Sequence, residues 1–183
     1  MLKIASTDIR RVLFSSSLGG SLEMYDFVLF IFFAPIIARH FLPLENSAVA
    51  LIYTLLIFAM GYFMRPLGGL LFGHFGDRYG RKRGLLIAIW MMGLATLTIG
   101  CLPSFAHIGY SATVLLILCR LLQGIAVGGD LPGSLLFTAE HSEHKSICLN
   151  ISLVSLGINL GAFFAPLLCG WVGETYNWHY GFG

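Results

Sequence analysis

The sequence predicts an all-α membrane protein that crosses the bilayer several times. Of its 183 residues, 57% are hydrophobic and only 11% are charged, and the mean hydropathy of +0.82 lies far above that of soluble domains. The apolar runs are about 20 residues or longer, which is the length a helix needs to cross the hydrocarbon of a bilayer. Much of the charge is concentrated in a short connection, with five charged side chains between Asp77 and Arg83.

Five complete spans and the start of a sixth follow from these runs. The first begins after basic residues, as a signal peptide does. It contains Glu23 and Asp26 and lacks a small-residue cleavage pattern, so we expect it to be retained. The second ends at the charged connection, the third at LPSFAHIGY and the fourth at EHSEHKS, and the sixth begins near residue 178. The expected ranges are about 14–39, 48–73, 84–102, 111–139 and 146–172.

The distribution of basic residues predicts the orientation. Alternate connections, starting with the amino terminus, carry most of the lysines and arginines, whereas the other connections carry only Arg39. Basic connections remain on the cytoplasmic side of a membrane. We therefore expect a multi-pass protein with a cytoplasmic N-terminus. The basic residues of the first set are Lys3, Arg10, Arg11, Arg78, Arg81, Lys82, Arg83 and Lys145.

Five ionisable residues lie inside the predicted spans. Because a charge facing lipid is costly, each should face a partner or a water-filled cavity. They are Glu23 and Asp26 in the first span, Arg65 in the second, and Arg120 and Asp130 in the fourth. We expect the first and fourth spans to line a polar interior, with a contribution from the second. The third span has no charge past its ends and is expected to face lipid.

Glu23 and Asp26 are three residues apart and therefore share a helix face near the middle of the bilayer. Two carboxylates so close in a low dielectric resist ionising together, which favours reversible proton binding. The alternative is a structural site in which an arginine on a neighbouring helix pairs with them.

Arg120 and Asp130 are not expected to pair with each other, because ten residues of helix separate them by about 80° and about 15 Å. As a permanent cation, Arg120 suits either a substrate carboxylate or a response to the protonation of a nearby acid. A structural ion pair with Glu23 or Asp26 is the alternative. Glycines at four-residue spacing predict close helix contacts. The pairs are 69 with 73, 124 with 128, 129 with 133, and 157 with 161.

Other classes of function have weaker support. The net charge of +2, with no basic face interleaved with aromatics, argues against a nucleic-acid partner. The four cysteines are far apart and form no CxxC pair. His141 and His144 stand among Glu140 and Glu143, but their spacing matches neither zinc-protease pattern, and a solvated helix end is the alternative. We therefore expect no metal, no cofactor and no catalytic residue, and an intramembrane metalloenzyme is a minor alternative.

Two motifs resemble the signatures of the major facilitator superfamily. GHFGDRYGRKR at 73–83 is similar to Gly-x-x-x-Asp-Arg-x-Gly-Arg-Lys between its second and third helices, and RLLQG at 120–124 is similar to Arg-x-x-Gln-Gly on its fourth. Four shorter segments resemble its metabolite:proton symporters, in which the third more often carries Glu than Asp. These segments are EMYDF at 23–27, RPLGG at 65–69, GGD at 128–130 and TAEH at 138–141.

The resemblance implies that residues 1–183 are the N-terminal, six-helix half of a transporter in a bacterial inner membrane. It implies alternating access between two halves and symport of protons with a small carboxylate or zwitterion, as in relatives that import 2-oxoglutarate, citrate, proline or betaine. The implied proton-coupling residues are Glu23, Asp26 and Asp130. The implied substrate or charge-relay residues are Arg65, Arg120 and Gln123. The implied cytoplasmic gating turn consists of Gly73, Asp77, Arg78, Gly80, Arg81 and Lys82.

The chain stops at HYGFG, where the sixth helix is expected to begin, and the resemblance implies six further helices beyond it. Activity is therefore expected to need a C-terminal half. The alternative is a truncated remnant that does not transport, or one part of a split transporter.

Overall fold

The computed structural model describes residues 6–42 and 44–175, and within them the side chains of residues 9–42 and 44–167. The sixth span expected near residue 178 lies outside these residues. Five helices of the described part are long and apolar enough to cross a membrane. They are α1 (Ser6–Phe41), α2 (Ser47–Tyr79), α3 (Arg81–Gly100), α5 (Tyr110–Glu140) and α6 (Ile147–Thr175), and a short α4 (Phe105–Ile108) precedes α5. Helices α5 and α6 overlap the fourth and fifth expected spans.

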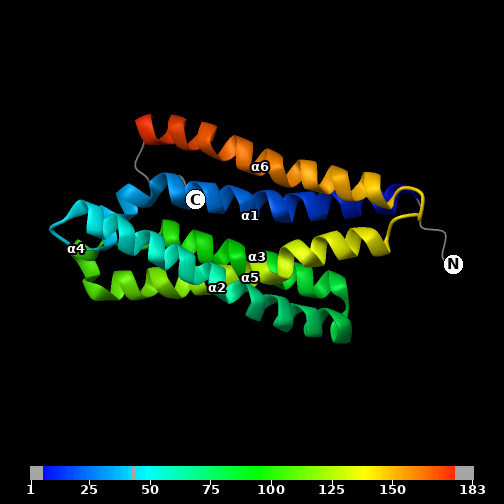
Figure 1. The fold of residues 1–183 in the computed structure, drawn as a ribbon, viewed down its shortest axis with the longest axis horizontal. Helices are drawn as coiled ribbons and strands as arrows, with labels where there is room; N and C mark the ends of the chain where they lie inside the picture. The colour runs from blue at the N-terminus through cyan, green and yellow to red at the C-terminus, as the bar shows by residue number, and fades with distance from the viewer. Residues whose placement is uncertain (1–5, 43, 176–183) are drawn as a thin grey trace.

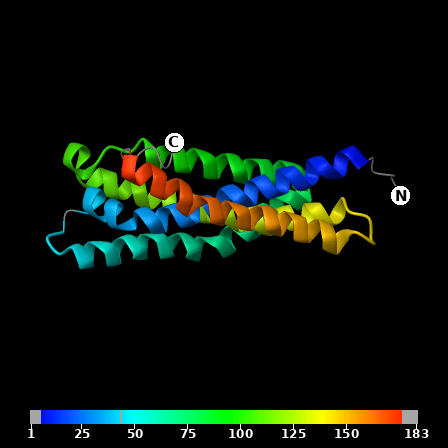
Figure 2. The same ribbon diagram turned by 90° about the horizontal axis from the view of Figure 1, so that it is seen from above.

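The long helices run side by side along the long axis of the molecule (Figure 1). One end holds the start of α1, the α2–α3 turn and the α5–α6 connection, and we call it the N-terminal end. The other holds the α1–α2 connection and α4, and we call it the α4 end (Figures 1 and 2). The basic connections Arg10–Arg11, Arg78–Arg83 and Lys145 are all at the N-terminal end, as the alternation in the sequence predicts.

The α2–α3 turn is a single residue. Gly80 has a φ of +98°, a conformation that causes steric strain in other residues. It is both the C-cap of α2 and the N-cap of α3. Its N–H donates to the Gly76 carbonyl over 3.0 Å. At the other end of α2, the Asn46 side chain accepts a hydrogen bond from the Ala48 N–H. These two residues set where α2 begins and where the chain reverses.

Glycines allow close contact within two pairs of helices, α2 with α5 and α1 with α6. A methyl group on Gly124 of α5 would collide with the Gly61 carbonyl of α2, and one on Gly128 would collide with the Arg65 carbonyl. Helices α1 and α6 meet in the same way, with Gly157 against Ser17 and Gly161 against the Ser21 carbonyl. Small residues at four-residue spacing thus let the backbones approach closely. Of the predicted glycine positions, Gly73 makes no such contact, because nothing lies within 4 Å of an added Cβ.

An apolar core fills the α4 end of the bundle. There Phe30, Phe33 and Ile37 of α1 pack on Ile99 of α3 and Leu116 of α5. Large apolar side chains cover the outer surface, as expected for helices surrounded by lipid. The expectation that the third span faces lipid holds for one face of α3 only. Trp90, Leu94 and Leu97 point outward, but the opposite face is buried against α5 and carries a polar residue of the interior, Thr96.

Candidate functional site

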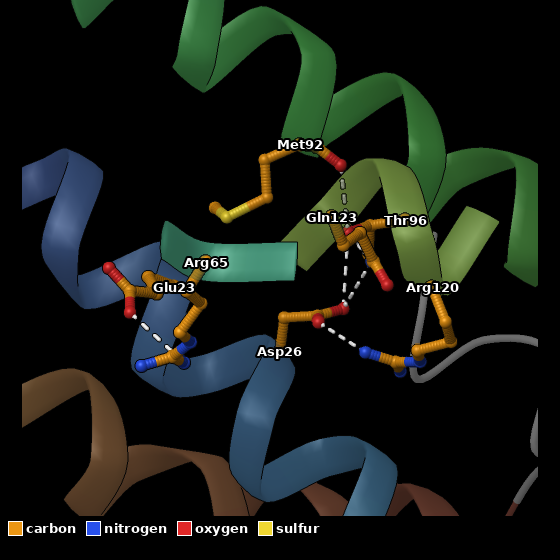
Figure 3. Close-up of polar contacts among 7 residues, drawn as sticks. All are labelled: Glu23, Asp26, Arg65, Met92, Thr96, Arg120 and Gln123. Atoms are coloured by element: carbon orange, nitrogen blue, oxygen red, sulfur yellow. Dashed lines mark hydrogen bonds and ion pairs between the residues drawn. The ribbon is translucent and has the colours of Figure 1, made fainter. Parts of the chain in front are cut away.

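A cluster of four polar side chains joins α1, α3 and α5 in the middle of the bundle, and we call it the central cluster. Arg120 donates from Nη1 to Asp26 Oδ2 over 2.9 Å. Gln123 Nε2 donates to Asp26 Oδ1 over 3.0 Å, and Thr96 Oγ1 donates to the same oxygen over 3.1 Å. Figure 3 shows the three donors converging on the carboxylate. The members of the central cluster are Asp26, Thr96, Arg120 and Gln123.

The helix geometry explains why these residues meet. Arg120 and Gln123 are three residues apart and therefore occupy one face of α5. That face is turned toward α1, and the guanidinium of Arg120 lies 3.6 Å from the centre of the Phe30 ring. The Thr96 hydroxyl accepts from Gln123 Nε2 over 2.8 Å, and the Met92 carbonyl, 3.0 Å away and one turn earlier on α3, is a second acceptor within reach of its single proton. An aromatic face and a carboxylate are two environments that stabilise a buried guanidinium.

Several polar atoms of this region have no hydrogen-bond partner among the described residues. They include Nε and Nη2 of Arg120 and Oε1 of Gln123, on side chains that are 4% and 3% exposed. Since a buried donor or acceptor without a partner is costly, these atoms are available to hydrogen-bond a ligand or water. They border a cavity of about 30 Å³, which has room for water but not for a metabolite. Its lining includes Glu23, Phe27, Phe58, Tyr62 and Arg65.

A second charged pair joins α1 to α2. Arg65 Nη2 lies 3.5 Å from Glu23 Oε1, and its guanidinium stands 3.9 Å from the centre of the Tyr62 ring. The side chain of Glu23 is 2% exposed and that of Arg65 is 30% exposed, so the pair extends from the buried interior toward the surface of the bundle (Figure 3). Although Glu23 and Asp26 are neighbours on one face of α1, each has its own arginine.

Asp130 lies apart from both pairs. Its carboxylate reaches the α1 backbone at Gly19, where an added Cβ would stand 3.1 Å from Oδ1 and 3.2 Å from Oδ2. Gly19 is one helical turn from Glu23, on the side of the N-terminal end. Asp130 is 1% exposed, and within the described part of the chain neither oxygen has a hydrogen-bond partner. Asp130 and Arg120 do not pair, as their separation on one helix predicts.

The charged turn, residues 73–83, forms its own contacts at the N-terminal end. Arg81 Nη2 lies 2.7 Å from Asp77 Oδ1, and Arg81 Nε lies 3.6 Å from Glu140 Oε1 at the end of α5. Arg78 lies over the Tyr79 ring at 5.7 Å. Gly73 makes no close contact, Gly80 provides the reversal, and Lys82 lines a cavity together with Arg11 and His141.

The structure thus brings Asp26, Arg120 and Gln123 into one cluster, pairs Glu23 with Arg65, and leaves Asp130 separate. The sequence interpretation did not identify Thr96 or Glu140 as site residues. A threonine in an apolar helix commonly bonds to its own backbone, so Thr96 gives no signal of its own. Glu140 is part of the TAEH segment, which could have indicated it. No group of three or more His, Cys, Asp or Glu in the described residues is placed to hold a metal ion.

Comparison with known proteins gives consistent relatives. The chain is 42% identical to the shikimate transporter of Escherichia coli over 153 residues, which is 83% of this chain and 35% of that protein. It is 38% identical to the proline/betaine transporter of Salmonella typhimurium over 170 residues, covering 91% of this chain and 34% of that protein. It is 39% identical to the alpha-ketoglutarate permease of E. coli over 141 residues, covering 75% and 33%.

The chain therefore spans about a third of the length of these curated relatives. No solved structure matches it. The relatives are transporters and not enzymes, which agrees with the expectation of a transporter rather than an enzyme. The family model for the Major Facilitator Superfamily matches residues 16–183, which include all four residues of the two charged pairs. This chain belongs to the Major Facilitator Superfamily.

Proposed function

We propose that the chain is the N-terminal half of a proton-coupled symporter that imports a small carboxylate or zwitterion. The observation that carries the proposal is the buried pair of Asp26 and Arg120, 2.9 Å apart and 6% and 4% exposed. A proton that binds Asp26 removes the charge that holds Arg120. Proton binding and the availability of a cation in the interior are therefore linked.

This linkage accounts for symport. Among the described residues, Nε and Nη2 of Arg120 have no hydrogen-bond partner, and loss of the ion pair frees Nη1 as well. A substrate carboxylate then binds to the guanidinium that the protonated Asp26 has released. Without the proton, the substrate must compete with Asp26 for the same cation. Each ligand consequently raises the affinity for the other, as the reciprocity of binding free energies requires.

The Glu23–Arg65 pair supplies a second charge of each sign beside the cavity. A carboxylate near Arg65 and an ammonium group near Glu23 and the aromatic rings of Phe58 and Tyr62 would together bind a zwitterion. The names of these relatives, which concern shikimate, proline, betaine and alpha-ketoglutarate, fit this range of chemistry. These four solutes are the first candidates for the substrate.

Alternating access supplies the rest of the mechanism. In this proposal the N-terminal end of the bundle is cytoplasmic in a bacterial inner membrane, because the basic connections are there. A C-terminal half completes the substrate site and rocks against this one. Asp77, which is 66% exposed at the charged turn, is available to a helix of that half as a cytoplasmic gate.

Uptake by the full-length protein in proteoliposomes tests the proposal. Labelled shikimate, proline, betaine and 2-oxoglutarate are each supplied with and without an inward proton gradient. We expect the gradient to drive accumulation of at least one solute in the wild-type protein, and Asp26→Asn to abolish the response to the gradient. A matched variant, Glu45→Gln, makes the same change from carboxylate to amide at an exposed residue of the α1–α2 connection, away from the cluster. Accumulation that is indifferent to the gradient, or an Asp26→Asn variant that still responds, contradicts proton coupling through this pair.

A further inference from the structure

We propose that the cavity in the middle of the bundle selects a substrate that carries an O–H or N–H donor beside its carboxylate, and that the side-chain oxygen of Gln123 accepts this donor. We call this space, which Glu23, Arg65, Arg120 and Gln123 border, the central cavity. The proposed class comprises hydroxy acids and amino acids with a primary or secondary amine. Quaternary ammonium zwitterions and oxo acids fall outside it. The inference rests on the proposed transport of a small carboxylate or zwitterion, and it narrows the substrate class of that same site.

The neighbours of the Gln123 amide set its orientation. Nε2 lies 3.0 Å from Asp26 Oδ1 and 2.8 Å from Thr96 Oγ1 (Figure 3). A carboxylate without a proton can only accept a hydrogen bond, so the amide group that faces Asp26 is the nitrogen. The amide oxygen, Oε1, has no hydrogen-bond partner among the described residues, although the side chain is only 3% exposed. Gln123 therefore offers a fixed, buried acceptor at the central cavity.

Arg120 offers the complementary group one turn earlier on α5. Its Nη1 donates to Asp26, whereas Nε and Nη2 have no hydrogen-bond partner within the described part of the chain. Nε and Nη2 form one edge of the guanidinium, and such an edge binds both oxygens of a carboxylate. Arg120 and Gln123 are three residues apart, so their Cβ atoms are about 5–6 Å apart on one face of the helix. Because both lie on α5, this spacing is retained when neighbouring helices move to admit a metabolite.

This spacing describes the ligand. A carboxylate on the free edge of Arg120 brings the carbons that follow it toward Gln123. A hydroxyl or amine on those carbons can donate to Oε1, whereas a fully methylated nitrogen or a keto oxygen has no hydrogen to donate. Across the cavity on α1, Glu23 adds two oxygens that lack a hydrogen-bond partner among the described residues. Beside the two arginines, the cavity thus presents acceptors that a substrate has to satisfy.

The replacement of water makes this requirement energetically important. The central cavity has room for water, which can donate to Gln123 Oε1 and to Glu23. A substrate that displaces such water loses affinity unless its own groups restore the hydrogen bonds, because a buried acceptor without a partner is costly. A site that accepts from a substrate O–H or N–H therefore rejects an analogue that lacks this group.

The aromatic rings at the cavity do not reverse this preference in favour of a quaternary ammonium group. Phe58 and Tyr62 line the cavity, and aromatic faces bind such groups when they are free. The guanidinium of Arg65 stands 3.9 Å from the centre of the Tyr62 ring, and that of Arg120 stands 5.8 Å from the centre of the Phe58 ring. A trimethylammonium group would compete with an arginine at each ring, whereas an N–H donor finds acceptors on Gln123 and Glu23.

Equilibrium binding to the full-length protein tests the selection without a proton gradient. Shikimate is compared with cyclohex-1-ene-1-carboxylate, which has the same ring and carboxylate without the hydroxyls. L-Proline is compared with N,N-dimethyl-L-proline, in which methyl groups replace both N–H donors. We expect shikimate or proline, whichever the protein binds, to have a Kd at least about tenfold lower than that of its analogue. The rise of Tm with ligand concentration, measured on the purified protein in detergent, gives each Kd.

Gln123→Met tests whether the amide oxygen makes the selection. Methionine has a similar length and only a weak acceptor, so the ratio of the two Kd values should fall toward one. Thr96→Val is the matched control, since it removes a contact of Gln123 Nε2 and leaves Oε1 in place. We expect this control to retain the wild-type ratio even if both compounds bind more weakly. A merely structural role of Gln123 would weaken both compounds equally and leave the ratio unchanged.

Equal Kd values within both pairs of compounds in the wild-type protein overturn the inference, whether or not any variant folds. Tighter binding of betaine or 2-oxoglutarate than of proline and shikimate also overturns it, as does a Gln123→Met protein with the wild-type ratio. Failure of all these compounds to bind refutes the proposed substrate range on which the inference rests. Selective binding together with uptake that is indifferent to the proton gradient refutes the proposed symport alone, so the two failures are distinguishable.

Discussion

Asp26 and Asp130 are both buried, at 6% and 1% exposed, but their surroundings differ in kind. Asp26 on α1 receives hydrogen bonds from Arg120, Gln123 and Thr96. Asp130 on α5 lies against Gly19 and has no partner among the described residues. The first environment stabilises a carboxylate and the second stabilises a neutral acid. Burial of an acid in a membrane helix therefore does not reveal its charge; the donors around it do.

The same substitution should destabilise the fold strongly at Asp26 and hardly at all at Asp130, and this is the largest effect we expect. Asp26→Asn leaves the Arg120 cation buried without its counter-charge, which should lower the free energy of unfolding by about 3–5 kcal/mol. Asp130→Asn replaces an unpaired group of the same shape and should change it by less than about 1 kcal/mol. Thermal or denaturant unfolding of the purified full-length variants in one detergent measures both. Equal losses at the two sites would remove the distinction between them.

The space around Asp130 gives a second comparison. An alanine at Gly19 would place its Cβ 3.1 Å and 3.2 Å from the two carboxyl oxygens, so Gly19→Ala should destabilise the fold by about 1–3 kcal/mol through overpacking. Gly93→Ala is the control, because nothing lies within 4 Å of its added Cβ, and it should be neutral or stabilising by up to about 1 kcal/mol.

A double-mutant cycle shows whether Gly19 acts through Asp130. Asp130→Ala removes the two oxygens that the new methyl group would meet, so Gly19→Ala should be less harmful in that background. We expect an interaction free energy of about 0.5–3 kcal/mol, as measured for residues in contact. Strictly additive losses would show that the Ile89 side chain, also 3.1 Å from the added Cβ, accounts for the clash instead.

The hydroxyl of Thr96 allows a smaller test of the Asp26 site. Thr96→Val removes a donor to Asp26 and an acceptor for Gln123 and should lower the free energy of unfolding by about 1.5 kcal/mol. Thr54→Val removes a hydroxyl whose hydrogen bond, within the described part of the chain, is to the Ala50 carbonyl of its own helix, and it should have a smaller effect. Unfolding in detergent measures both, and a larger loss in Thr54→Val would contradict the importance of the donor to Asp26.

The sequence predicted the helices well because their cause is local. Apolar runs of bilayer length must form helices, whose backbone groups are all bonded internally. The five charges inside these runs also predicted a polar interior. Their pairing depends on which helix faces which, and residue spacing within one helix does not specify that. The sequence placed Glu23 and Asp26 together on one face, and only the packing assigns Arg65 to the first and Arg120 to the second.

Packing also explains what the sequence analysis missed. Thr96 joins the site because it lies beside Ala88, Met92 and Ala95 on the face of α3 that is buried in the bundle. Nothing in the apolar run of α3 indicates which face is buried. The glycine spacing predicted close contacts, but Gly124 and Gly128 meet α2 whereas Gly73 meets nothing, and spacing alone does not separate these cases.

The smallest effect on folding is expected at the charged turn, and there the comparison extends to a group that is not buried. Asp77 is 66% exposed, and its ion pair with Arg81 at four-residue spacing should contribute only about 0.3–0.5 kcal/mol. Arg81 also retains Glu140 when Asp77 is changed. We therefore expect Asp77→Asn to unfold in detergent almost as the wild type does, while gradient-driven uptake by the full-length protein falls. That pattern would place the function of Asp77 at a surface outside this chain, as a gate between halves requires. A large loss of stability would instead make Asp77 a structural residue of the α2–α3 turn. Burial would then no longer explain why the ion pair of Asp26 is expected to stabilise the fold more than that of Asp77.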